Sequence, residues 1–176
     1  MIRYQITDGT AALDPERWFA RLRNDVDFIQ IREPELAARD LADLVRRAIE
    51  VSSCPILVND RIDIALACGA AGAHLRSGGV SPRIVKRLEN LIVSVACHNL
   101  DEVRSAEGAD YAILAPVFKP LSKSDSREPL GIANLQRLVR VSSVPVIALG
   151  GITEANTTAC IEAGAAGVAG ITLFGR

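Results

Sequence analysis

Polar residues suited to phosphate or metal chemistry directly follow two apolar runs of the chain. In IQIRE, Gln30 and Arg32 alternate with isoleucines, so the two polar side chains point to one face of a strand. Asn59 and Asp60 end the run ILVND. A guanidinium fork suits phosphate, and a carboxylate can hold Mg²⁺ together with waters and substrate phosphates. The alternatives are structural: an ion pair of Arg32 with Glu33 or Asp60, or Asp60 as a cap of the following helix.

Glycines in the last third of the chain form a second candidate site. Gly150 and Gly151 follow one apolar run, and Gly170, Ile171 and Thr172 end the next. Glycine lets backbone N–H groups approach an anion closely, and in parallel barrels the loops after the seventh and eighth strands commonly bind phosphate. These residues predict a phosphate-binding rim. A tight turn followed by a small-residue strand is the alternative.

The long loop at 116–130 and the two histidines add further candidates. Lys119 and Lys123 lie in this loop and can reach a phosphate as point charges, whereas the alternative is a solvated loop. His74 and His98 each stand at the end of an apolar run. There they can bond to a neighbouring backbone group or shuttle a proton.

These residues need a scaffold that gathers strand ends, and the chain has the pattern of one. Short β-rich runs alternate with stretches of helical period, and no linker rich in Ser, Gly or Pro divides them. The expected strands are 3–7, 27–32, 56–59, 73–75, 92–98, 111–115, 146–149 and 168–172. An internal repeat supports this reading, because VSSCPIL at 51–57 recurs as VSSVPVI at 141–147.

The repeated unit predicts an α/β fold, a TIM-type (β/α)8 barrel in a short form that lacks the last helix. An open doubly wound sheet is the alternative fold. We expect one domain over residues 1–176. A strand left uncovered by the missing helix would expose an apolar patch, so we also expect a homo-oligomer.

Composition excludes several classes of protein. The chain carries 20 basic and 21 acidic side chains and no run of like charge, so it lacks the basic footprint that binding to nucleic acid needs. Its start has no signal-peptide pattern, and no stretch approaches the length of a membrane helix. We therefore expect a cytoplasmic protein that binds neither nucleic acid nor a membrane.

Taken together, the motifs resemble the thiamine-phosphate synthase family, including its TenI-like thiazole tautomerase branch, over essentially the whole chain. The matching segments are YQITD, IQIRE, ILVNDRIDIAL, GAHL, SVACHNLDEV, GADYAILAPVF, LSK and PVIALGGITEANTTACIEAGAAGVAGI. Each is common alone, whereas the ordered set is specific to the family.

The resemblance implies a transferase that joins hydroxymethylpyrimidine pyrophosphate to thiazole phosphate and releases diphosphate with the help of Mg²⁺. The implied small-molecule partners are these phosphate substrates. In this family Gln30, Arg32 and Asn59 would face the pyrophosphate, Asp60 would bind Mg²⁺ and Lys123 would neutralise the leaving group. Ser122, which precedes Lys123 in the loop at 116–130, would also bind the substrate. The thiazole phosphate would lie against the glycine rim described above, at Gly151, Ile171 and Thr172.

Departures from the family pattern leave other functions open. The family's HLGQ with acidic residues is HLRSGG here, so the second carboxylate for Mg²⁺ is absent, and Arg76 offers its own charge in the same loop. The proton-shuttling histidine of the tautomerase branch falls at Pro116. The alternatives to a synthase are a thiazole tautomerase and a non-catalytic relative that binds a phosphate ligand.

Overall fold

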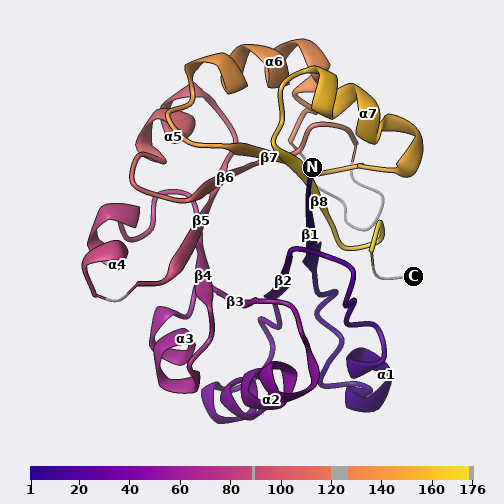
Figure 1. Ribbon diagram of the computed structural model, residues 1–176, viewed down its shortest axis with the longest axis vertical. Coiled ribbons are helices and arrows are strands. Elements are labelled where there is room, and N and C mark those ends of the chain that lie inside the picture. Colours follow the sequence, from indigo (N-terminus) through magenta and orange to yellow (C-terminus); the bar gives the residue numbers. More distant parts are fainter. Residues whose placement is uncertain (89, 120–126, 175–176) are drawn as a thin grey trace.

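The computed structural model describes residues 1–88, 90–119 and 127–174. Eight parallel strands form a closed barrel in the order β1 to β8, and β8 pairs with β1 (Figure 1). The strands are β1 (Ile2–Ile6), β2 (Phe28–Ile31), β3 (Ile56–Asn59), β4 (Gly72–Leu75), β5 (Ile92–Cys97), β6 (Tyr111–Leu114), β7 (Val146–Ala148) and β8 (Gly167–Gly170). The predicted TIM-type barrel is confirmed, and the open doubly wound sheet is excluded.

The helices alternate with the strands and surround the barrel (Figure 1). They are α1 (Pro15–Phe19), α2 (Ala38–Val51), α3 (Ile62–Cys68), α4 (Pro82–Leu88), α5 (Leu100–Ser105), α6 (Gly131–Val141) and α7 (Glu154–Glu162). Within the described residues no helix follows β8, as predicted. The described helices include none that is long and apolar enough to cross a membrane.

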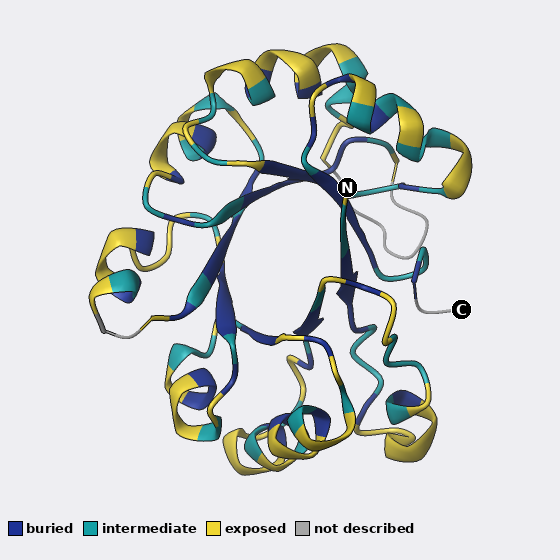
Figure 2. Ribbon diagram, in the orientation of Figure 1, coloured by how far each residue is buried: buried dark blue, intermediate teal, exposed yellow. Residues whose placement is uncertain are grey.

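Apolar side chains form two layers, one inside the barrel and one between the strands and the helices. The interior cluster consists of Tyr4, Ile6, Leu57, Ile113, Ile147 and Ala169. Figure 2 shows buried strands and helices whose outer faces are exposed. Because successive strand residues point to opposite faces, strands covered on both sides must be apolar at most positions. This explains why runs such as ILV of β3 show no polar alternation.

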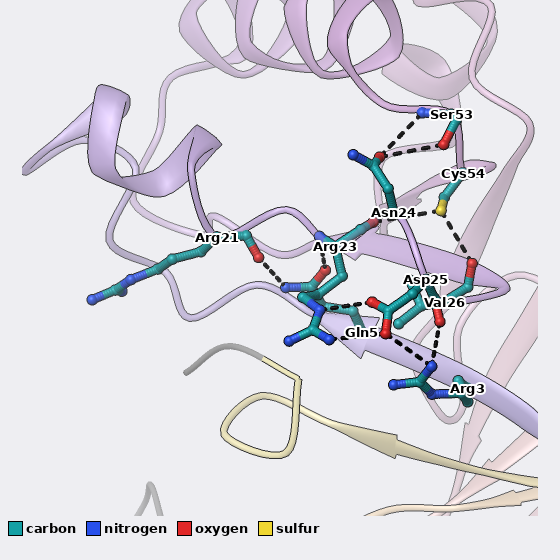
Figure 3. A network of polar contacts seen from close by, with 9 residues as sticks. All are labelled: Arg3, Gln5, Arg21, Arg23, Asn24, Asp25, Val26, Ser53 and Cys54. Atoms are coloured by element: carbon teal, nitrogen blue, oxygen red, sulfur yellow. Dashed lines mark hydrogen bonds and ion pairs between the residues drawn. The ribbon is translucent and has the colours of Figure 1, made fainter.

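Polar contacts hold the segment between α1 and β2 (Figure 3). The buried Gln5 donates from Nε2 to the carbonyl of Arg21 over 2.8 Å and accepts the N–H of Arg23 at Oε1 over 2.9 Å. Arg3 and Arg23 both pair with Asp25, at 3.0 and 2.7 Å. The hydrogen bond from Arg23 holds the pKa of Asp25 well below its usual range. Gln5 thus satisfies both of its amide atoms while it anchors this segment to β1.

Candidate active site

A pocket of about 390 Å³ opens at the carboxyl ends of the strands. Most of the site residues predicted from the sequence line it, namely Gln30, Arg32, Asn59, Gly150, Gly151, Gly170, Ile171 and Thr172. The carboxyl end is where barrels of this kind carry their active sites. Two further predicted residues, Ser122 and Lys123, lie outside the described residues.

Gln30 and Asn59 form a polar pair on neighbouring strands. Gln30 Nε2 donates to Asn59 Oδ1 over 2.8 Å, and Gln30 is only 1% exposed. The other amide atom, Gln30 Oε1, is buried and has no hydrogen-bond partner among the residues that the structure describes. A buried acceptor without a donor is unfavourable by about 1–3 kcal/mol. Gln30 lines the pocket, so a ligand bound there can supply the missing donor.

Arg32 keeps its guanidinium available, because Glu33 is engaged elsewhere. The buried Glu33 carboxylate accepts hydrogen bonds from Thr7 Oγ1 and Trp18 Nε1, both at 2.8 Å, and from the N–H of Ala11 at 2.9 Å. Glu33 thus fastens the loop between β1 and α1. An ion pair between Arg32 and Glu33, one of the structural alternatives, is wrong. Arg32 makes no ion pair with any described residue.

The pocket is cationic. Arg76 and Arg127 line it together with Arg32, whereas no aspartate or glutamate does so within the described part of the chain. Arg127 belongs to the loop at 116–130, but the sequence did not single it out as a residue of the site. Three guanidinium groups around one pocket favour a ligand with several negative charges.

Asp60 stands at the mouth of this pocket rather than in its lining. Its backbone has φ 56°, the left-handed conformation that Asp tolerates, and its N–H donates to the carbonyl of His74 over 2.7 Å. Its carboxylate pairs with Arg76 at 3.5 Å. The capping alternative does not hold, because the cap residue of α3 is Arg61 and has no side-chain cap bond. Among the described residues no group of three or more His, Cys, Asp or Glu side chains could hold a metal ion.

His74 joins the pocket to the barrel interior. Its Nδ1 lies 2.9 Å from Ser94 Oγ, which lies 3.0 Å from the hydroxyl of Tyr4. Burial, together with the nearby charges of Arg32 and His98, lowers the pKa of His74 to about 4. His74 is therefore neutral at pH 7 and lines the pocket as a fixed hydrogen-bonding group. No sequence pattern signalled Tyr4 and Ser94, because only barrel closure brings them together.

His98 has a different partner, the carboxylate of Glu102. Glu102 Oε2 accepts hydrogen bonds from the His98 backbone N–H and from Nδ1, both at 2.7 Å. Burial alone would raise the pKa of Glu102, but hydrogen bonds from Ser77 and His98 lower it. Because Nδ1 donates to Glu102, Nε2 of His98 is the free nitrogen, and His98 lines the pocket.

The glycine rim follows β7 and β8. Gly150 and Gly151 have φ 95° and 62°, which only glycine adopts freely. A Cβ atom on Gly150 would lie 2.7 Å from Pro116 Cα, so the loop after β6 also requires a glycine here. The carbonyl of Gly151 accepts a hydrogen bond from Asn156 Nδ2 of α7 over 2.9 Å. The rim is thus a tightly built backbone surface.

Known proteins with similar sequences and structures agree with this geometry. Residues 4–174 match the family described as thiamine monophosphate synthase. The chain is 38% identical over 159 residues to a putative thiamine-phosphate synthase 2 of Aquifex aeolicus, covering 87% of this chain and 85% of that protein. It is 36% identical over 151 residues to the thiamine-phosphate synthase of Chloroflexus aurantiacus, covering 80% and 68%.

A solved structure is similar over nearly the whole chain. The thiamine phosphate pyrophosphorylase from Pyrococcus furiosus superimposes with a TM-score of 0.80 at 28% identity, covering 97% of this chain and 85% of that one. The family match begins within β1, extends past β8 and includes every described residue of the pocket lining. This chain therefore belongs to the thiamine monophosphate synthase family.

Proposed function

We propose that this chain joins hydroxymethylpyrimidine pyrophosphate to thiazole phosphate and releases diphosphate, the transferase reaction of its family. The observation that carries the proposal is that one pocket has two parts suited to anions. Arg32 and Arg76 follow β2 and β4, whereas Gly150 follows β7 and Gly170 ends β8. In the closed barrel, β1 on one side and β5 and β6 on the other separate these two pairs of strands. Two phosphate-bearing substrates need two such parts.

The reaction requires neutralisation of charge more than acid or base catalysis. The bond between the pyrimidine methylene carbon and the diphosphate oxygen breaks, and the oxygen keeps the electron pair. The thiazole nitrogen then donates its lone pair to the methylene carbon, so no proton has to move. Arg32 and Arg76 stabilise the negative charge of the leaving diphosphate. Gln30 Oε1 accepts a hydrogen bond from the pyrimidine substrate, and Lys123 and Ser122 keep their predicted roles.

The Mg²⁺ ion that the resemblance implies does not fit the residues present. Mg²⁺ is usually bound through one or two carboxylates together with waters and substrate phosphates. Here the carboxylate of Asp60 is paired with Arg76, and no other described carboxylate reaches the pocket lining. No step of the proposed reaction therefore passes through a metal ion.

Synthesis of thiamine phosphate from the two substrates tests the proposal. We expect product from the wild type, and a loss of about a hundredfold or more in kcat/KM for Arg32→Ala, in the range found when a transition-state charge partner is removed. Arg83→Ala is the matched control, because Arg83 lies on α4 and pairs with Glu107 away from the pocket. Folded wild type that forms no product would contradict the proposal.

A second candidate function rests on His98 and its carboxylate partner. Such a pair can move a proton, as isomerisation of a thiazole phosphate requires. Exchange of substrate protons with deuterated water in the absence of the pyrimidine substrate would favour this tautomerase. Binding of thiazole phosphate with neither reaction would favour the non-catalytic relative.

The cytoplasmic location, the single domain over 1–176 and the homo-oligomer stay predictions.

A further inference from the structure

The acidic groups nearest to the pocket mouth already have partners within the protein. Asp60 Oδ2 lies 3.5 Å from Arg76 NH1. Both oxygens of Glu102 accept hydrogen bonds, Oε2 from His98 and Oε1 from Asn99 at 3.1 Å. The carboxylates of Asp60 and Glu102 are therefore engaged by donors of the protein itself.

The pairing of Asp60 with Arg76 follows from the sheet. Asn59 of β3 stands opposite His74 of β4, so the residues that follow these strands emerge side by side. The hydrogen bond from the Asp60 N–H to the His74 carbonyl fixes the turn in which Asp60 points toward Arg76. The backbone pairing of β3 with β4 therefore brings Asp60 and Arg76 together.

The loop after β4 is built around the Arg76 stem. The N–H of Gly79 donates to the carbonyl of Arg76 over 3.2 Å, and a Cβ atom on Gly79 would lie 3.1 Å from Arg76 Cγ. Ser77 bonds to Glu102 of α5 and so ties the loop to the next helix. The stem is thus positioned, while the guanidinium side chain is 74% exposed.

An exposed ion pair at 3.5 Å is weak, so a stronger anion can draw the guanidinium away from Asp60. Arg32 lines the same pocket and has no ion-pair partner among the described residues. A diphosphate carries several charged oxygens in a geometry that two guanidinium forks can bind bidentately. The two arginines supply the positive charge that a divalent cation would otherwise supply.

We propose that Arg76, with Arg32, forms a diphosphate subsite that works without a divalent cation, and that Asp60 pairs with Arg76 in the free protein instead of binding metal. This inference rests on the proposed transferase function and names how its leaving group is held. When the methylene carbon to oxygen bond breaks, the diphosphate takes the electron pair, and the two guanidinium groups neutralise the added charge.

Calorimetric titration with inorganic diphosphate tests the subsite, in buffer with a chelator and in buffer with Mg²⁺. The wild type should bind diphosphate in chelator. Arg76→Gln should weaken that binding by about tenfold to a hundredfold, as expected for a lost charged hydrogen bond. Asp60→Asn should bind as tightly as the wild type or more tightly, because Arg76 is released. Arg83→Gln, which alters an exposed arginine on α4, should change nothing.

The opposite pattern would overturn the inference. It fails if the wild type binds diphosphate only with Mg²⁺ or not at all, if Asp60→Asn abolishes binding, or if Arg76→Gln has no effect. Failure of the transferase function is distinguishable. Metal-independent binding that depends on Arg76, without formation of thiamine phosphate, would keep the subsite and reject the function. Product that forms only with Mg²⁺ and is lost in Asp60→Asn would keep the function and reject the role of Arg76.

Discussion

Two buried glutamines on neighbouring strands of the barrel have opposite relations to their surroundings. Gln5 on β1 is 2% exposed, and both of its amide atoms bond to the backbone of the segment before β2. Gln30 on β2 is 1% exposed, yet within the described part of the chain only its Nε2 is bonded. Side-chain type and burial are the same, and only the hydrogen-bond inventory differs.

This difference separates a structural residue from a functional one. A buried amide with both atoms bonded contributes to stability, whereas an unpaired acceptor is unfavourable for the free protein and becomes favourable when a ligand donates to it. Gln5 faces a segment of the chain's own backbone, and Gln30 faces a pocket lined by arginines. Substitutions at Gln5 should therefore act on folding, and substitutions at Gln30 on catalysis.

His74 is buried and bonded within the protein like Gln5, and it lines the pocket like Gln30. Its titration gives the largest expected change in the free energy of unfolding. Ser94 bonds its Nδ1, and burial lowers its pKa from 6.5 to about 4. Because the unfolded chain takes up this proton first, the free energy of unfolding is unaffected above about pH 6.5 and falls as the pH drops toward 4. The loss amounts to about 3 kcal/mol. Urea unfolding of the wild type between pH 8 and pH 4 measures this loss, because the range extends from above the ordinary pKa of 6.5 down to the lowered pKa of about 4.

His74→Gln provides the control for this titration, because glutamine keeps a hydrogen-bonding group beside Ser94 but cannot take up a proton in this range. The acid-induced fall in stability of the variant should be smaller than that of the wild type by the His74 share. Equal pH profiles for both proteins would mean that His74 does not carry the titration.

Gln5→Met tests the structural member of the glutamine pair. The substitution leaves the carbonyl of Arg21 and the N–H of Arg23 without their partner, so the free energy of unfolding should fall by about 2 kcal/mol. Chemical denaturation measures this fall, and kcat/KM of the folded fraction should stay at the wild-type value. A lowered kcat/KM with an unchanged unfolding midpoint would assign Gln5 to the site instead.

The barrel could be predicted from the sequence because its signal is local and repeated. Apolar runs such as ILVN and VIAL are short, and the repeat at 51–57 and 141–147 shows that the same unit occurs twice. Strand ends differ from prediction by one or two residues, as for β2, which spans Phe28–Ile31 rather than 27–32. Hydrophobic periodicity locates a strand better than the residues at which its pairing stops.

The candidate site could be predicted only in part. Residues that follow a strand, such as Arg32 and Asn59, share an edge by topology, so their place in the pocket follows from the fold class. The chain of Tyr4, Ser94 and His74 joins residues far apart in sequence across the closed barrel, and no local pattern encodes it. The ion pair of Arg32 with Glu33 was a wrong alternative because Trp18 of α1 donates to the Glu33 carboxylate, a contact that the sequence around Glu33 does not encode.

Gln30→Met sharpens the glutamine comparison with the smallest expected change. Methionine is unbranched and similar in length, so it can occupy the buried position while removing the unpaired oxygen. The free energy of unfolding should stay equal to that of the wild type or rise. The half-buried Asn59 loses a donor that water can replace at the pocket.

With the acceptor for the pyrimidine substrate gone, kcat/KM of Gln30→Met should fall by about tenfold, the loss expected for one hydrogen bond to a ligand. Steady-state kinetics and chemical denaturation of Gln30→Met and Gln5→Met, measured in parallel, compare the two glutamines. If Gln30→Met loses stability but keeps kcat/KM, Gln30 is a structural residue. If the change from glutamine to methionine lowers catalysis at Gln30 and stability at Gln5, then the unpaired oxygen of Gln30 serves to bind the ligand and not to stabilise the fold.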